Sequence, residues 1–168
     1  MNAVLLIGIG LIYIATRAAR VNTETHASPH FTWAELQTTN TGLPNKPGAQ
    51  EEAWLEALSV EILEPLRRQF GPIKINSGYR SEAVNLRVNG SPTSQHLLGQ
   101  AADIVSPNFT PEQIATWIYL YGNIPVRQVI IYPPDNGNFL HVSIDPKRPA
   151  KRQFLIKRQS LFEGWKPA

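Results

Sequence analysis

Two histidines and an aspartate carry donor atoms that could hold a metal ion: His96, Asp103 and His141. The chain has no cysteine, so a zinc ion would have to be bound by imidazole and carboxylate groups. A catalytic zinc site takes three such ligands and leaves a fourth position for water or substrate. From residue types and spacing alone, a second interpretation stays open: a hydrogen-bonded core histidine and two unrelated polar residues.

The sequence around these residues indicates which elements would position them. His141 lies in an apolar run at residues 139–144 that predicts a strand, and Asp103 lies in a short strand at residues 101–105. His96 follows a polar turn, and Gly99 allows the chain to double back towards Asp103.

Helical patterns dominate the first half of the remaining chain and strand patterns the second. A capping-box pair, Thr32 and Glu35, predicts a short helix, and Pro65 predicts a kink or break in the helix expected at residues 49–70. Further helices are expected at residues 81–88 and 110–122, and further strands at residues 73–77, 126–132 and 154–156. We therefore predict an α+β fold with a small antiparallel sheet flanked by helices.

Several ordered blocks resemble the zinc D-alanyl-D-alanine carboxypeptidase family. They are Ile75-Asn-Ser-Gly-Tyr-Arg-Ser, Ser94-Gln-His followed by Gly99 and Asp103, and His141-Val-Ser. That family includes cell-wall carboxypeptidases, D-Ala-D-Ala dipeptidases, phage L-alanyl-D-glutamate endolysins and the hedgehog signalling domain. The stretches HFTWAEL and LEPLRRQFG are similar to its phage and bacterial branch, and the resemblance spans residues 30–158. It implies a small α+β domain with a zinc site on the sheet.

The resemblance also implies roles for individual residues. It makes His96, Asp103 and His141 the zinc ligands, and it assigns Arg80 to a substrate carboxylate or to the oxyanion of the reaction. A planar, permanently charged guanidinium suits either task, although Arg80 could also be an ordinary surface arginine. Ser94 and Gln95 are expected to shape the site and bind substrate through hydrogen bonds, or else to be turn residues.

The general base is where the sequence departs from the family pattern. Relatives place a Glu or Asp a few residues before the second histidine, but Asn138 stands three residues before His141 and cannot accept a proton. Asp135 is the nearby carboxylate that precedes His141, so we predict it as the catalytic base; the alternative is a turn aspartate. Asp145 is a weaker second choice. If neither residue serves, activity is weak or absent.

The function predicted from these blocks is hydrolysis of peptide bonds in the stem peptides of bacterial peptidoglycan, by a D,D-carboxypeptidase or an L,D-endopeptidase. Two alternatives follow from the missing base and from the apolar N-terminus. One is a catalytically weak or inactive zinc-binding module that recognises the wall, as in hedgehog. The other is a structural component of a phage virion or its membrane.

The N-terminal segment, residues 1–20, is expected to be separate from the folded domain. Residues 3–15 carry no charge, and Arg17 and Arg20 follow them. We predict membrane association through residues 3–19, hence a membrane-anchored protein of the bacterial envelope or a phage virion, with the side of the membrane left open. A cleaved signal peptide and a buried helix are the alternatives. Residues 21–29 are expected to be a linker, and residues 30–168 the peptidase domain.

The formal net charge of +3 and the pI of about 9.3 suit a polyanionic surface such as the cell wall. Much of the positive charge lies late in the chain, at Lys147, Arg148, Lys151, Arg152, Lys157 and Arg158. A solvated basic edge explains these residues most simply. No nucleic-acid-binding module accompanies them, so we predict no nucleic-acid partner. We expect a monomer.

Overall fold

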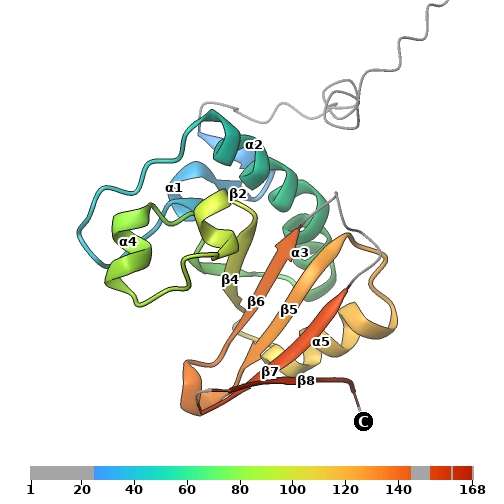
Figure 1. The fold of residues 1–168 in the computed structure, drawn as a ribbon. Coiled ribbons are helices and arrows are strands. Elements are labelled where there is room, and N and C mark those ends of the chain that lie inside the picture. The colour runs from blue at the N-terminus through green and yellow to red at the C-terminus, as the bar shows by residue number, and fades with distance from the viewer. Residues whose placement is uncertain (1–24, 145–151, 160, 168) are drawn as a thin grey trace, which may run out of the picture.

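A computed structural model describes residues 25–144, 152–159 and 161–167, in which long helices pack against one face of a six-stranded sheet (Figure 1). The helical elements are α1 (Trp33–Leu36), α2 (Ala49–Leu58), the π-helical turn η2 (Ser59–Leu63), α3 (Glu64–Phe70), α4 (Glu82–Arg87), the 3-10 turn η3 (Gln95–Leu98), α5 (Pro111–Leu120) and the 3-10 turn η4 (Pro134–Asn136). The strands are β1 (His26–Ser28), β2 (Phe31–Thr32), β3 (Lys74–Ser77), β4 (Ala101–Val105), β5 (Val126–Tyr132), β6 (Phe139–Ile144), β7 (Gln153–Arg158) and β8 (Leu161–Gly164).

The large sheet has the strand order β3-β4-β6-β5-β7-β8, and β1 pairs with β2 in a separate small sheet. The predicted α+β fold with an antiparallel sheet is confirmed, with one exception in the pairing. β7 runs parallel to β5, while the other neighbouring strands are antiparallel. β8 was not predicted, because all four of its residues are exposed and show no apolar alternation.

Alternation along the central strands gives the sheet two different faces. Ile104, Leu140 and Val142 point into the hydrophobic core, together with residues of the helical segment at residues 49–70 and of α5. Their neighbours in sequence, Asp103 and His141, point to the opposite face. The register pairs Asp103 directly with His141 across β4 and β6. A single backbone pattern therefore supplies the core on one side and places two of the predicted ligands together on the other.

The helical segment at residues 49–70 continues through Pro65 without a break. A proline lacks the N–H for the usual helical hydrogen bond, and its ring collides with the preceding turn. Here the wider π-helical turn η2 comes immediately before the proline, which occupies the first turn of α3. Helical turns of this kind accommodate an extra residue, so the helix remains continuous and keeps Leu58, Ile62 and Leu66 buried.

The predicted linker at residues 21–29 requires a correction at its end, because residues 26–28 form β1. Ser28 is buried and donates a hydrogen bond to Glu64 Oε1 over 2.8 Å. The backbone N–H of His30 donates to the same oxygen, and the His30 ring contacts Glu64 Oε2, each over 2.8 Å. One buried carboxylate in α3 thus fastens the start of the described chain to the helical segment.

The predicted membrane anchor also requires correction. Within the described residues, no helix is both long enough and apolar enough to cross a membrane; a span takes about 20 apolar residues. The helical segment at residues 49–70 has the length but carries acidic side chains along it. The apolar residues 3–19 lie outside the described part of the chain. We therefore do not retain the transmembrane helix, the membrane association or the membrane-anchored localisation.

Glu64 provides a test of how the N-terminal strands are held. Replacing it with glutamine removes the charge and presents an amide donor where an acceptor is needed. We expect Glu64→Gln to lower the free energy of unfolding by about 1–3 kcal/mol at neutral pH, measured by urea denaturation. Glu82→Gln, at an exposed position of α4, is the control and should change it by about 0.5 kcal/mol or less.

The same pair of proteins should respond differently to acid. Burial raises the pKa of Glu64, but the hydrogen bonds from His30 and Ser28 outweigh it and leave the pKa below its ordinary value of 4.5. A carboxyl with a lowered pKa stabilises the fold above that ordinary value, and this contribution is lost as the pH falls below it. The stability gap between parent and Glu64→Gln should therefore narrow in acid. A gap of constant size would contradict this account.

Candidate metal centre

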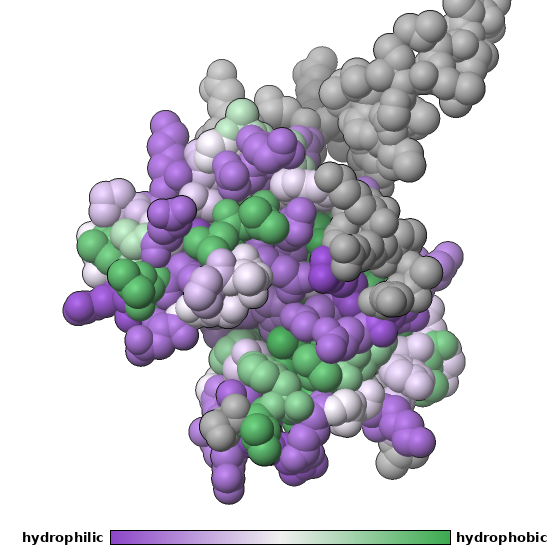
Figure 2. All heavy atoms as spheres, in the orientation of Figure 1, coloured by the Kyte–Doolittle hydropathy of each residue, from purple (hydrophilic) through white to green (hydrophobic). Residues whose placement is uncertain are grey.

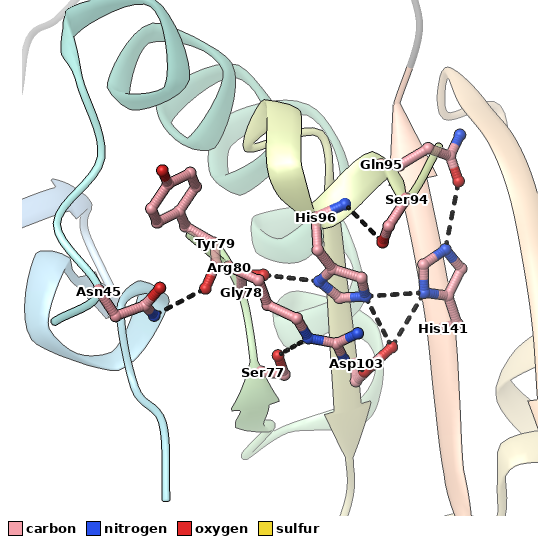
Figure 3. Close-up of polar contacts among 10 residues, drawn as sticks. All are labelled: Asn45, Ser77, Gly78, Tyr79, Arg80, Ser94, Gln95, His96, Asp103 and His141. Atoms are coloured by element: carbon pink, nitrogen blue, oxygen red, sulfur yellow. Dashed lines mark hydrogen bonds and ion pairs between the residues drawn. The ribbon is translucent and has the colours of Figure 1, made fainter. Parts of the chain in front are cut away.

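Three buried donor atoms converge on the open face of the sheet: His96 Nε2, His141 Nδ1 and Asp103 Oδ1 (Figure 3). Asp103 Oδ1 lies 2.9 Å from His141 Nδ1 and 3.2 Å from His96 Nε2, and the two nitrogens are 3.2 Å apart. Asp103 comes from β4, His141 from β6, and His96 from the turn η3 that crosses in front of these strands. The structure thus brings together the three residues that the sequence proposed as ligands.

Hydrogen bonds on the outer side of each ring determine which nitrogen faces the centre. His96 Nδ1 lies 2.6 Å from the carbonyl oxygen of Gly78, which can only accept, so the proton belongs on Nδ1. His141 Nε2 lies 3.4 Å from Gln95 Oε1, which favours the proton on that nitrogen. Both rings then turn an unprotonated nitrogen towards Asp103. Partners of this kind orient metal-binding histidines in general.

Electrostatics keep the cluster in the form that a cation requires. Burial alone would raise the pKa of Asp103, but the charge of a protonated His96 and a hydrogen bond from a protonated His141 Nδ1 would hold it well below its usual range, so the carboxylate stays ionised whether protons or a cation face it. Burial lowers the pKa of His141 more than Asp103 raises it, so the imidazole stays neutral. An ionised carboxylate and neutral imidazoles are the states that bind metal ions.

The donor set fits a tetrahedral zinc ion. With zinc bonds of about 2.0–2.2 Å to nitrogen and oxygen, neighbouring ligand atoms of a tetrahedron lie about 3.3 Å apart. The three separations here, 2.9, 3.2 and 3.2 Å, are close to that value. In the described chain, this is a group of donors compact enough to hold a metal ion. Three acceptor atoms that face one another repel each other unless a positive group lies between them, so they favour a bound cation.

Arg80 contacts the second oxygen of Asp103 instead of standing free in the cavity. Its Nη2 donates to Asp103 Oδ2 over 2.5 Å, and its Nε donates to Ser77 Oγ over 2.8 Å. The Arg80 backbone N–H donates to the His96 carbonyl over 3.1 Å. Arg80 therefore orients the Asp103 carboxylate, and its backbone joins the segment after β3 to the turn η3 that carries His96. The sequence predicted a residue for substrate or oxyanion and gave no sign of this contact.

The remaining predicted site residues lie at different distances from the cluster. Gln95 contacts the His141 ring, and the Ser94 hydroxyl accepts from the His96 backbone as the N-cap of η3. Asp135 lies in the exposed turn η4 between β5 and β6, and in the described chain no hydrogen bond or ion pair joins it to the cluster. Asn138 lies two residues after this turn, with φ of 54°. Asp145 lies outside the described residues.

Tyr132 is a further neighbour of the site, and the sequence assigned it no role. Its ring stacks on Phe139, with centroids 4.1 Å apart. Burial raises the pKa of the Tyr132 hydroxyl, and the charge of Asp103 raises it further. The side chain is therefore a neutral hydrogen-bond donor beside the cluster. Alternation along β5 puts Tyr132 on the same face as Ile130, which pairs with His141.

A cavity of about 510 Å³ opens beside Asp103 and Arg80. Its walls come from the loop before α2, from β3, from α4 and from Phe139. On the face drawn in Figure 2, hydrophilic residues gather over the middle of the molecule and hydrophobic residues over the lower strands. Of the three cluster residues, Asp103 lines this cavity, so the cluster stands at its edge.

Gly78 shows why the cluster depends on residues far from it in sequence. A Cβ at Gly78 would lie 2.2 Å from the Leu36 carbonyl oxygen at the end of α1. That oxygen accepts a hydrogen bond from Tyr79 N–H, and Asn45 bridges the Gln37 and Tyr79 carbonyls. The close approach fixes the Gly78 carbonyl that orients His96. The glycine was part of the predicted motif, but its contact with α1 was not foreseen.

An α+β fold whose sheet presents a His–Asp–His cluster beside a cavity provides three donor groups of the kind that a catalytic zinc site uses. The family model described as Peptidase M15 matches residues 29–143, which is more than half of the chain. The chain belongs to this peptidase family, and the family predicted from the sequence is confirmed.

The chain is also similar to the zinc D-Ala-D-Ala carboxypeptidase of Streptomyces albus G, with 35% identity over 78 residues. The similar region covers 45% of this chain and 31% of that protein. The chain therefore matches about a third of the length of this relative.

The Gly78 contact can be tested without any assay of activity. Gly78→Ala would place a methyl group against backbone atoms of α1, which cannot move aside without breaking the Tyr79–Leu36 hydrogen bond. We expect a loss of about 2–4 kcal/mol in the free energy of unfolding, measured by thermal or urea denaturation. Gly164→Ala is the matched control, since open space surrounds Gly164. Equal stabilities for the two variants would contradict the proposed packing.

Proposed function

We propose that this chain is a zinc-dependent peptidase that hydrolyses peptide bonds in the stem peptides of bacterial peptidoglycan, as a D,D-carboxypeptidase or an L,D-endopeptidase. The observation that carries the proposal is the convergence of His96 Nε2, His141 Nδ1 and Asp103 Oδ1 at separations of 2.9–3.2 Å. Membership of the peptidase M15 family and similarity to a zinc D-Ala-D-Ala carboxypeptidase support the reaction and the metal.

His96, Asp103 and His141 would hold the zinc ion, which when bound supplies a Lewis acid and makes water nucleophilic near neutral pH. Other residues of the chain would orient the ligands and bind the substrate. Gly78 and Gln95 keep the two imidazoles oriented through hydrogen bonds to their outer nitrogens.

Arg80 holds Asp103 through one Nη atom, and its remaining guanidinium N–H groups are proposed to bind a substrate carboxylate or the developing oxyanion. The cavity beside the cluster would receive the peptide. Ser94 and Gln95, on the η3 side, are proposed to help bind it through hydrogen bonds.

The metal assignment predicts that zinc content depends on each ligand. The purified parent should retain about one equivalent of zinc and lose it to a chelator, with a fall in melting temperature, because a metal that binds only the folded state stabilises it. His141→Ala should retain little zinc. His26→Ala removes an imidazole outside the cluster and should keep the parent's zinc content. Zinc retained by His141→Ala at the parent level would refute the assignment.

The reaction itself is tested by digesting purified peptidoglycan with the zinc-loaded parent and identifying the products by mass spectrometry. Chelator should stop the release of products and added zinc should restore it. The new termini report which bond is cut, so the same experiment separates a carboxypeptidase from an endopeptidase. His141→Ala supplies the inactive control.

Asp135 is proposed as the general base, and Asp135→Asn tests it because the change preserves side-chain shape and the capacity to form a turn. Loss of a general base costs about 10² to 10⁴ in rate, while zinc content should be unchanged because Asp135 is not a ligand. The measurement is the rate of product release at equal zinc content. A variant as fast as the parent would make Asp135 a turn residue only.

A second candidate function is a zinc-binding module that recognises the wall without cutting it. The position of Asp135 favours this alternative, since in the described residues Asp103 is the carboxylate that contacts His96 and His141, and Asp135 lies in an exposed turn. If zinc-loaded parent protein sediments with peptidoglycan but releases no product, this second function replaces the first.

A further inference from the structure

The cavity beside the metal centre extends away from the cluster along the edge strand β3. Ser77 pairs with Asp103 at the end of β3 near the cluster, while Lys74 pairs with Val105 further along. Both Ser77 and Lys74 line the cavity. The partners on β4, Asp103 and Val105, are two positions apart, because the register shifts between Ile75 and Ser77. Two residues of strand cover about 7 Å, so the cavity has a metal end and a far end about that distance apart along the sheet.

The charges in the cavity do not balance. Its charged lining residues are Lys74, Arg80 and Asp103. Arg80 and Asp103 contact each other directly and offset one another. Lys74 is exposed, and in the described chain no hydrogen bond or ion pair is made by its side chain. The far end of the cavity thus presents a positive charge that the protein itself does not neutralise.

The wall between the two ends mixes apolar and uncharged polar side chains. Val84 of α4 and Val88, which follows that helix, lie among the lining residues with Phe139 of β6, while Asn76 and the loop residues Thr38 to Asn40 are polar. A cavity of this mixed lining that ends at an ammonium group suits a peptide that carries an anionic group at that end. An amide or hydroxyl head group would leave the ammonium without its preferred partner.

We propose that Lys74 is a specificity-determining residue that binds a carboxylate of the substrate at the far end of the cavity, away from the metal cluster. This inference deepens the proposed function and rests on it for the nature of the substrate. Stem peptides carry carboxylates, so the question becomes which of them Lys74 selects. Lys74 takes no part in bond breaking in this proposal; it sets which peptides bind with their scissile bond at the cluster.

The test uses synthetic stem peptides in which each carboxylate is converted in turn to the carboxamide. Binding to the zinc-loaded full-length protein is measured by calorimetry or fluorescence anisotropy, and hydrolysis of the same peptides is measured in parallel. With the parent, amidation of one particular carboxylate should weaken binding about tenfold, as expected for loss of a charge-assisted contact in a partly enclosed site. KM should rise by a similar factor and kcat should change little.

Lysine variants show whether Lys74 is the residue that discriminates between the carboxylate and the carboxamide. Lys74→Met should bind the carboxylate and carboxamide forms of that peptide equally, whereas Lys74→Arg should restore much of the discrimination. Lys46→Met removes an exposed lysine in the loop before α2, outside the cavity lining, and should discriminate like the parent. Discrimination that persists in Lys74→Met, or a parent that binds all amidated peptides equally, would overturn the proposal.

Measuring both binding and hydrolysis tests the Lys74 subsite and the peptidase reaction separately. If the parent discriminates in binding through Lys74 but cuts none of the peptides, the carboxylate subsite stands and the peptidase reaction fails. If the parent cuts peptides and Lys74→Met cuts the carboxylate and carboxamide forms with the parent's own preference, the reaction stands and the subsite fails.

Discussion

The carboxylate of Asp103 is the group on which the site depends. It is almost fully buried, and an ionised carboxyl away from water is unfavourable unless charged or hydrogen-bonding partners surround it. Each of its two oxygens has its own partners. Oδ1 faces His96 and His141, and Oδ2 is held by Arg80. Loss of Arg80 or of a histidine would leave a buried charge undercompensated, so the four side chains form one unit.

That unit is built from segments that meet only because the sheet brings them together. Pairing of β4 with β6 sets Asp103 opposite His141, and η3 brings His96 across the front of both strands. Gly99, with φ of 68°, ends η3 in the left-handed conformation, and a Cβ there would lie 2.4 Å from the Glu51 carbonyl oxygen of α2. The turn that carries His96 is therefore seated on a helix of the core.

The sheet's two faces explain how stability and function are kept apart. Core residues such as Leu140 and Val142 alternate with His141 along β6, so the packed face stays apolar while the other face holds polar and charged groups. Polar neighbours such as Ser77 and Gln95 contact Arg80 and His141, respectively. A substrate that enters beside Phe139 would meet groups already held in place, which is the arrangement that catalysis favours.

Much of this protein was determined by the sequence itself, because local rules act over a few residues. The capping box of Thr32 and Glu35 and the apolar run at residues 139–144 each predicted an element that the structure contains. The motif blocks also identified the family, and with it the fold and the donor residues. The helices and strands depend on neighbours along the chain, so a sequence read in order is sufficient for them, whereas the candidate ligands came from the resemblance of the motif blocks to a family.

Contacts between distant segments were decided only by the tertiary structure. His141 meets Asp103 across 38 positions and His96 across 45. Which nitrogen of each ring faces the centre depends on the Gly78 carbonyl and the Gln95 amide, and Arg80 proved to hold Asp103. The parallel pairing of β7 with β5 likewise has no local signal. Side-chain direction and strand partners are set by packing over the whole domain. Residue types and their spacing along the chain therefore do not reveal them.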